Sequence, residues 1–228
     1  MTWMNQPASS KIAGDQIAEV WDISERNSAA HRFRHRGVMA YAEFSSDSRR
    51  VVTASVDGTV RVWDTATGQP ITPPMKQESP VRFAAFSPNG RRVVTTSYEG
   101  ARVWDAASGH PLTPLLRHGG PVIHAQFSDD GHRVIIASMD GTARVLNAAT
   151  GQPVTPPLRH YGPVLTASFS PDGQQVVTAS ADYTARVWDA STGQPLTRPL
   201  VGSKYKAAMD VAQFSPDGRR VLTGDRAG

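Results

Sequence analysis

One pattern of about forty residues recurs along almost the whole chain, and this repeat limits the possible folds more than any other feature. A phenylalanine opens each copy, with steps of 42, 41, 42 and 45 residues, at Phe44, Phe86, Phe127, Phe169 and Phe214. A tryptophan closes the copies at Trp21, Trp63, Trp104 and Trp188, and Leu146 stands where one more is due. A period of this size, made of short strands and turns, predicts a radial array of small antiparallel sheets.

The composition of the 228 residues fits one folded domain. The absence of cysteine excludes disulfides and thiolate metal sites, so stability has to come from packing and hydrogen bonds. No secretory signal begins the sequence, and no segment has the roughly eighteen apolar residues that cross a bilayer. We therefore expect a cytoplasmic protein without a membrane segment. The net charge of +4 only slightly raises the chance of an acidic partner.

Each full copy contains four strand signals separated by turn chemistry. In the copy that begins at Pro163, the turn Ser170-Pro171-Asp172-Gly173 follows the first strand, because proline and glycine there favour chain reversal. The four predicted strands are Val164–Phe169, Val176–Ser180, Thr184–Asp189 and Pro195–Thr197. Proline in the fourth segment predicts an outer edge strand, because proline cannot donate to a ladder.

The motifs Phe-Ser-Pro-Asp-Gly, Thr-Ala-Ser-x-Asp-Gly-Thr and Arg-Val-Trp-Asp recur in register. Together they resemble the WD-repeat β-propeller family over roughly residues 17–228, and the Thr-Gly-Gln-Pro that follows looks like the close tandem repeats of large bacterial proteins. The resemblance implies an all-β fold of four-stranded antiparallel blades.

The family also carries a buried hydrogen-bonded tetrad of histidine, strand hydroxyl, aspartate and tryptophan. The resemblance transfers this tetrad to two units, as His35, Thr53, Asp57 and Trp63, and as His160, Thr178, Asp182 and Trp188. We expect these residues to be structural, because catalytic or metal-binding residues would occur once and these recur at the repeat spacing.

Two units depart from the tetrad. Where tryptophan becomes Leu146, the threonine becomes Ile136, so we expect a shortened network around His118 and Asp140 with no atom left unpaired. In the unit of Trp104, Gln77 and Glu99 replace the histidine and the aspartate.

We expect residues 1–16 to be an N-terminal arm and residues 17–228 to be one propeller. The predicted units are 36–77, 78–118, 119–160 and 161–201, and residues 17–35 with 202–228 form a composite blade. This blade would close a five-bladed ring by setting Trp21 against Thr223, as is typical of the family. Alternatively, two chains complete each other through these half-blades, so the chain is either a monomer or a dimer.

Positions that vary between units predict a contact surface for a protein or peptide partner on the face around the central channel. Aromatic residues, methionine and arginine are favoured in interface cores. The candidate residues are Tyr41, Arg82, Phe83, Tyr98, Ile123, His124, Met139 and Leu165. The alternative interpretation is that these positions vary by drift on a solvated rim.

The sequence predicts a non-enzymatic interaction scaffold without cofactor or metal, because known catalytic and phosphate-binding motifs are absent. One alternative is a propeller-based enzyme that uses Asp210, Arg82 and His124 at the channel. Another is nucleic-acid binding by a rim of arginine pairs, namely Arg49-Arg50, Arg91-Arg92 and Arg219-Arg220. We expect these arginines to be solvated turn residues instead, because the aromatic side chains of a single-strand groove are missing.

Overall fold

The computed structural model describes residues 16–22, 28–202 and 208–225. The expected N-terminal arm lies outside these residues except for Gln16, where the first strand begins. The strands are β1 (Gln16–Asp22), β2 (Ser28–His35), β3 (Met39–Phe44), β4 (Arg50–Ser55), β5 (Thr59–Asp64), β6 (Met75–Lys76), β7 (Val81–Phe86), β8 (Arg92–Ser97), β9 (Gly100–Asp105), β10 (Val122–Phe127), β11 (Arg133–Ser138), β12 (Thr142–Asn147), β13 (Leu158–Arg159), β14 (Val164–Phe169), β15 (Gln175–Ser180), β16 (Thr184–Asp189), β17 (Leu200–Val201), β18 (Met209–Phe214) and β19 (Val221–Asp225). None of the described residues forms a helix able to cross a membrane.

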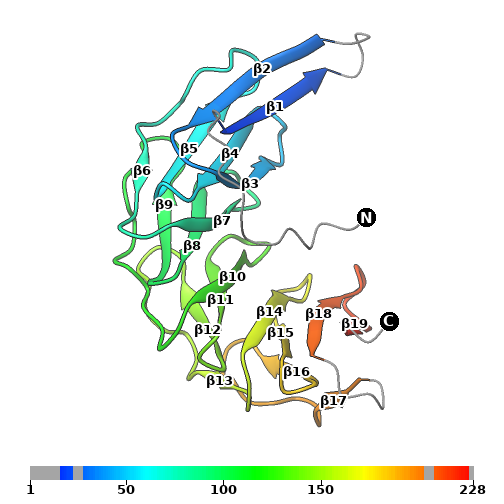
Figure 1. Cartoon of the computed structure of the whole chain (residues 1–228). Coiled ribbons are helices and arrows are strands. Elements are labelled where there is room, and N and C mark those ends of the chain that lie inside the picture. Colours follow the sequence, from blue (N-terminus) through cyan, green and yellow to red (C-terminus); the bar gives the residue numbers. More distant parts are fainter. Residues whose placement is uncertain (1–15, 23–27, 203–207, 226–228) are drawn as a thin grey trace.

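These strands form small antiparallel sheets that follow one another along the chain. The β3–β6, β10–β13 and β14–β17 sheets have four strands, and each forms one blade. The β7–β9 blade has three strands, and an isolated bridge between Ala101 and Leu116 takes the place of the fourth. The β1–β2 and β18–β19 pairs lie at the two ends of the row (Figure 1). The predicted all-β propeller fold is therefore confirmed.

The core lies between neighbouring blades. Alternate side chains of a strand point to opposite faces, so each sheet offers one apolar face to the blade before it and one to the blade after it. Val52 and Val62 of the β3–β6 blade, for example, pack with Val81 and Phe86 of the β7–β9 blade. The first strands line the concave side of the row and the short fourth strands lie on the convex side (Figure 1).

The fourth strand of the β14–β17 blade was predicted too early, because it begins at Leu200, five residues after Pro195. In the β14–β17 blade, Pro195 makes only an isolated bridge with Trp188, and the strand itself is Leu200–Val201, paired with Thr184 and Ala185. The physical reason is the missing N–H of proline, which stops a ladder from continuing at that point.

The predicted composite blade is not formed within the chain. The β1–β2 and β18–β19 pairs are separate sheets, and they lie at opposite ends of an open arc (Figure 1). Trp21 is 56% exposed and so does not meet Thr223, whereas Trp63, Trp104 and Trp188 are buried. Each blade packs against the next through equivalent strands, and the row of four blades with its two end pairs forms an arc that does not close (Figure 1).

Long polar side chains connect neighbouring blades. The guanidinium of Arg92 donates to the carbonyl of Gly131 at 2.9 Å, and that of Arg133 donates to the carbonyl of Gly173 at 2.7 Å. The equivalent Arg50 lies over the Phe86 ring of the following blade, 5.3 Å from its centroid. Bonds from a charged donor are stronger than neutral ones, so these arginines strengthen the contact between neighbouring blades.

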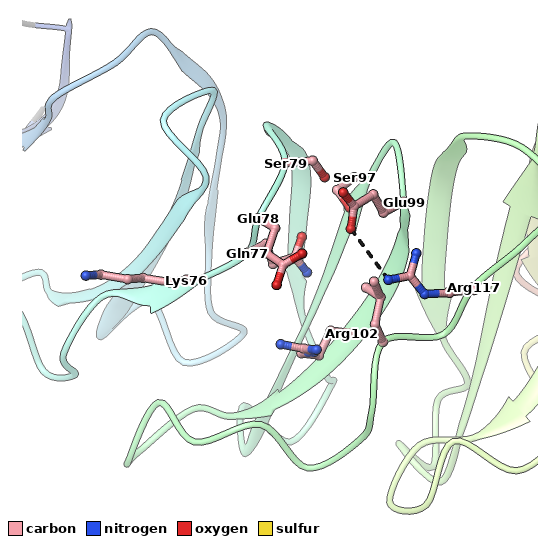
Figure 2. A pocket seen from close by; sticks show the side chains of 9 residues that line it. Lys76, Gln77, Glu78, Ser79, Ser97, Glu99, Arg102 and Arg117 are labelled. Carbon is pink, nitrogen blue, oxygen red and sulfur yellow. Dashed lines mark ion pairs between the residues drawn. The ribbon is translucent and has the colours of Figure 1, made fainter.

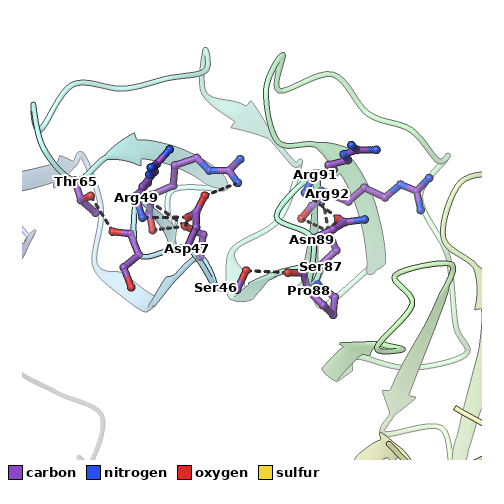
Figure 3. Close-up of polar contacts among 12 residues, drawn as sticks. Ser46, Asp47, Arg49, Thr65, Ser87, Pro88, Asn89, Arg91 and Arg92 are labelled. Carbon is purple, nitrogen blue, oxygen red and sulfur yellow. Dashed lines mark hydrogen bonds and ion pairs between the residues drawn. The ribbon is translucent and has the colours of Figure 1, made fainter. Parts of the chain in front are cut away.

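A second set of contacts crosses the same junctions. The backbone N–H of Phe86 donates to Glu43 Oε1 at 3.4 Å, and that of Phe169 donates to Gln126 Oε1 at 3.0 Å. Figure 3 shows a third contact, in which the Ser46 hydroxyl donates to the Pro88 carbonyl at 2.8 Å. The residue before the opening phenylalanine is therefore a junction residue in three units, at Glu43, Gln126 and Ser168, a role that the sequence alone did not indicate.

Candidate functional site

Four of the predicted contact residues line one pocket between two blades. Arg82 comes from β7, Tyr98 from the β8–β9 turn, Ile123 from β10 and Met139 from the β11–β12 turn. The pocket encloses about 260 Å³, and Ser97, Pro121 and Val122 complete its wall. We refer to these seven residues as the rim pocket.

Most of the rim pocket surface is apolar, and its single charged group is held in place. The Arg82 guanidinium lies 5.1 Å from the centroid of the Tyr98 ring, a distance suited to a cation–π contact. Tyr98, Ile123 and Met139 are all exposed, so the apolar surface is accessible from solvent. The arrangement suits an apolar side chain that has a carboxylate close by.

Three other predicted residues lie in a groove across the first strands of three blades. The ring centroids of Tyr41 and Phe83 are 4.6 Å apart, and those of Phe83 and His124 are 5.7 Å apart. This concave groove encloses about 460 Å³, and its lining also includes Glu43, Gln126 and Asp129. Leu165, the eighth predicted residue, lines neither the rim pocket nor the concave groove.

The titratable groups of the concave groove are shifted by burial. Burial and the nearby Glu43 carboxylate raise the pKa of Tyr41 to about 12, and burial also raises the pKa of Glu43. Burial lowers the pKa of His124 from 6.5 to about 4, so its ring is neutral near pH 7. Its Nδ1 atom is buried without a hydrogen-bond partner.

A third, smaller cavity of about 170 Å³ lies in the β7–β9 blade, in the unit that lacks the tetrad histidine and aspartate. Figure 2 shows that polar side chains surround it, with Glu99 directed to Arg117 across 3.9 Å. Gln77 Oε1 and Ser79 Oγ have no hydrogen-bond partner there. Glu99 therefore does not replace the tetrad aspartate, because it pairs with an arginine instead of with Gln77.

The β14–β17 blade brings its four predicted tetrad residues together. Trp188 Nε1 donates to Thr178 Oγ1 at 2.8 Å, and the Thr178 hydroxyl lies 2.7 Å from His160 Nε2. His160 Nδ1 lies 3.0 Å from Asp182 Oδ2. Because burial lowers the pKa of His160, the ring is neutral and its one proton is on Nδ1, where the carboxylate accepts it. Thr178 then donates to Nε2.

The aspartate of this network also holds its own turn. Asp182 accepts hydrogen bonds from the Thr184 hydroxyl at 2.6 Å and from the Tyr161 backbone N–H at 2.9 Å. Burial alone would raise the pKa of Asp182, but these hydrogen bonds together with His160 bring it below its usual value. The threonine that follows the acidic turn is thus a fifth member, and its recurrence in Asp-Gly-Thr was the sequence signal for it.

In the β3–β6 blade the equivalent threonine, Thr59, lies between the histidine and the aspartate. His35 Nε2 lies 2.7 Å from Thr53 Oγ1, and Trp63 Nε1 donates to the same oxygen at 2.7 Å. His35 Nδ1 is 2.9 Å from Thr59 Oγ1 but 3.9 Å from Asp57. The Thr59 hydroxyl therefore links the ring to the carboxylate.

The β10–β13 blade contains an unpaired histidine nitrogen. His118 Nδ1 lies 3.3 Å from Asp140 Oδ2, but His118 Nε2 is buried without a partner. Ile136 occupies the place of the threonine and offers no hydroxyl. The expectation that this shortened network has no unpaired atom is therefore wrong, because the threonine serves two partners and only the tryptophan was lost with it.

The residues named for the two alternative functions, a channel enzyme and a nucleic-acid-binding rim, do not gather into one site. Arg82 lies against Tyr98, His124 lies against Phe83, and Asp210 is on β18, two blades beyond β10. The described part of the chain contains no group of three or more histidine or carboxylate residues that could hold a metal ion. In the arginine pairs, Arg50 and Arg92 are used at blade junctions, whereas Arg49 and Arg91 are exposed (Figure 3). Arg219 and Arg220 of the third pair are both exposed.

Comparison with known proteins agrees with this geometry. The family model described as "WD domain, G-beta repeat" matches four segments, at residues 28–64, 72–105, 109–147 and 151–189, which together make up more than half of the chain. No curated protein matches the sequence. The crystal structure of the computationally designed Ika8 protein is similar, with a TM-score of 0.79 and 30% identity over 97% of this chain and 67% of that chain. The chain therefore belongs to the WD40 repeat family.

Proposed function

We propose that this chain is a non-catalytic, cytoplasmic interaction scaffold that binds a protein or peptide partner in the rim pocket. WD40 repeats generally mediate protein–protein interactions, which supports this class of function. The observation that carries the proposal is the convergence of Arg82, Tyr98, Ile123 and Met139 from two blades on one accessible apolar pocket. Aromatic, methionine and arginine side chains are the ones that dominate binding energy in interface cores.

The chemistry of the pocket limits the partner. An aliphatic or aromatic side chain would fill the apolar wall, and a carboxylate one or two residues away would pair with Arg82. Phe83 and His124 of the concave groove directly follow Arg82 and Ile123 in the sequence, so the continuation of the segment would lie against them. Nucleic acid fits less well, because the arginines that reach into the blade junctions are already engaged.

Peptide display on the purified chain tests the proposal. Selected peptides would be synthesised, and their binding to the unaltered chain and to Tyr98→Ala would be measured by fluorescence anisotropy. We expect Tyr98→Ala to weaken binding about tenfold or more, as for a typical hot-spot aromatic. Tyr161→Ala removes an even more exposed tyrosine outside the rim pocket and serves as the matched control. Equal affinities for Tyr98→Ala and the unaltered chain would refute the proposed site.

A further inference from the structure

Both ends of the described row of blades present an open sheet edge. Among the described strands, β19 pairs only with β18, and β1 pairs only with β2. These edges carry apolar side chains at the surface, because Trp21 is 56% exposed and Leu222 is 61% exposed. Unpaired edges with apolar side chains are sites where another strand adds.

The two open pairs are complementary halves of one unit. The β18–β19 pair repeats the first two strands of a blade, including the register shift that the β3–β4 pair also has. The β1–β2 pair corresponds to the last two strands, with Trp21 in the position of Trp63. It differs from them in that β2 runs as one eight-residue strand, where the complete blades have an isolated bridge and a two-residue strand. Each edge therefore lacks the strands that the other edge possesses.

We propose that a second copy of this chain supplies the missing half, so that β18–β19 of one copy and β1–β2 of the next form a four-stranded blade. The β4–β5 pairing gives the register, in which Val51 is opposite Trp63 and Val52 is opposite Val62. By equivalence, Val221 is opposite Trp21 and Leu222 is opposite Val20. Trp21 Nε1 then donates to Thr223 Oγ1, as Trp63 Nε1 donates to Thr53 Oγ1 at 2.7 Å.

The next junction supplies a second, independent argument. Gln213 of the β18–β19 pair has the position of Gln126, whose side chain accepts from the following blade at Phe169. Arg220 has the position of Arg133, which donates to the following blade at Gly173. In the described chain no blade follows β19, and both Gln213 and Arg220 are exposed.

The β3–β6 blade of the next copy has the matching acceptors. Phe44 is 52% exposed, whereas the equivalent Phe86 and Phe169 are 8% exposed beneath an arginine of the preceding blade. Ser48 has a φ of 58°, close to the values of 64° to 70° at the glycines that occupy this turn position elsewhere. The Arg220 side chain would cover the Phe44 ring and donate to the carbonyl of Ser48.

The same contacts cannot be made within one copy, because the two half-blades lie at opposite ends of the open arc (Figure 1). The interface is head-to-tail, so each copy uses one edge for the preceding copy and the other edge for the following copy. Such an interface gives a ring where the rotation closes and an open filament where it does not.

Cysteine cross-linking tests the interface, and the absence of native cysteine removes competing thiols. Val20→Cys and Leu222→Cys would be prepared as separate variants, mixed and oxidised gently. We expect a disulfide-linked dimer in the mixture and little in either variant alone, because a head-to-tail contact joins position 20 to position 222 only. The doubly substituted chain should give a ladder of linked oligomers. A linked monomer from the double variant, or no product in the mixture, would overturn the proposal.

Sedimentation of Arg220→Glu provides a second test, at the junction residue that would contact the following blade. We expect association to weaken about tenfold, because a repulsive charge replaces the junction arginine. Arg219→Glu changes the same charge at the neighbouring exposed position and should leave association unchanged. Equal association of both variants with the unaltered chain would contradict the proposed junction, and circular dichroism would verify that each variant folds.

Discussion

The β14–β17 and β10–β13 blades share one architecture but differ in the polar network beneath their surface. In the first blade, Thr178 joins Trp188 to His160, and every ring nitrogen has a partner. In the second, Ile136 replaces that threonine and His118 Nε2 is left unpaired. The difference shows the effect of losing a buried hydroxyl that has two partners. Leu146 removes the need of one partner, the tryptophan, but the histidine keeps a nitrogen without a hydrogen bond. An unpaired buried acceptor costs about 1–3 kcal/mol, so the β10–β13 blade carries a local weakness.

Removing the hydroxyl from the complete network should have the largest effect. Thr178→Val keeps the shape but leaves both Trp188 Nε1 and His160 Nε2 unpaired, so we expect a loss of about 3 kcal/mol in the free energy of unfolding. Ile136→Val is the control in the blade that already lacks the hydroxyl, and it should cost about 1 kcal/mol. Urea unfolding of both variants measures the difference. Equal losses would mean that the hydrogen bonds of the complete network do not contribute.

Removing the carboxylate from the same network should have a somewhat smaller effect. Asp182→Ala leaves His160 Nδ1 with only the 3.3 Å contact to Thr184 Oγ1 and removes the partner of the Tyr161 backbone N–H, and we expect a loss of about 2 kcal/mol. Asp172→Ala removes an exposed carboxylate from a neighbouring turn and should cost much less. An unchanged melting midpoint for Asp182→Ala would show that the aspartate does not stabilise the blade.

Acid should affect the β10–β13 blade through His124, which lies on its first strand. The pKa of His124 is lowered to about 4 in the folded chain, so below pH 6.5 the unfolded chain binds a proton that the folded chain rejects. Stability is therefore complete above pH 6.5 and falls as the pH drops toward 4. His124→Phe should reduce the loss between pH 7 and pH 4.5 by about 2 kcal/mol. Parallel stability curves for the two proteins would contradict this assignment.

Restoring the missing hydroxyl should produce the smallest effect. Ile136→Thr gives His118 Nε2 a donor but removes apolar volume, so the net change alone is not informative. A double-mutant cycle with His118→Phe isolates the pair, and we expect a favourable coupling of about 1 kcal/mol between the introduced hydroxyl and His118. A coupling of zero would indicate that His118 Nε2 is satisfied in another way.

Much of the candidate site could be anticipated from position within the repeat. Arg82, Tyr98, Ile123 and Met139 were selected because they vary where the family presents its channel face, and they do line one pocket. Leu165 was selected by the same rule and lies outside that pocket. The rule cannot separate the two cases, because whether two positions meet depends on which blades are neighbours and on the reach of each side chain.

The junction residues show a related limit. Arg50 and Arg92 read as ordinary turn residues, since each lies in a polar turn beside another arginine. Their partners are about forty residues away, in the next blade, and no local pattern connects the two. The altered β7–β9 blade is similar, because Gln77 and Glu99 change together in the sequence but have different partners. Gln77 donates to Thr95, and Glu99 pairs with Arg117.

The sequence by itself determined the repeat, the first three strands of each unit, the turns between them and the four core residues of the two complete hydrogen-bonded networks. These features depend on contacts within one unit, where spacing along the chain fixes which side chains share a face. Only the tertiary structure decided that the arc stays open, that His118 Nε2 is unpaired and that Trp21 is exposed. Those outcomes depend on the rotation from one blade to the next and on packing between units, which accumulate over the whole row and leave no local trace in the sequence.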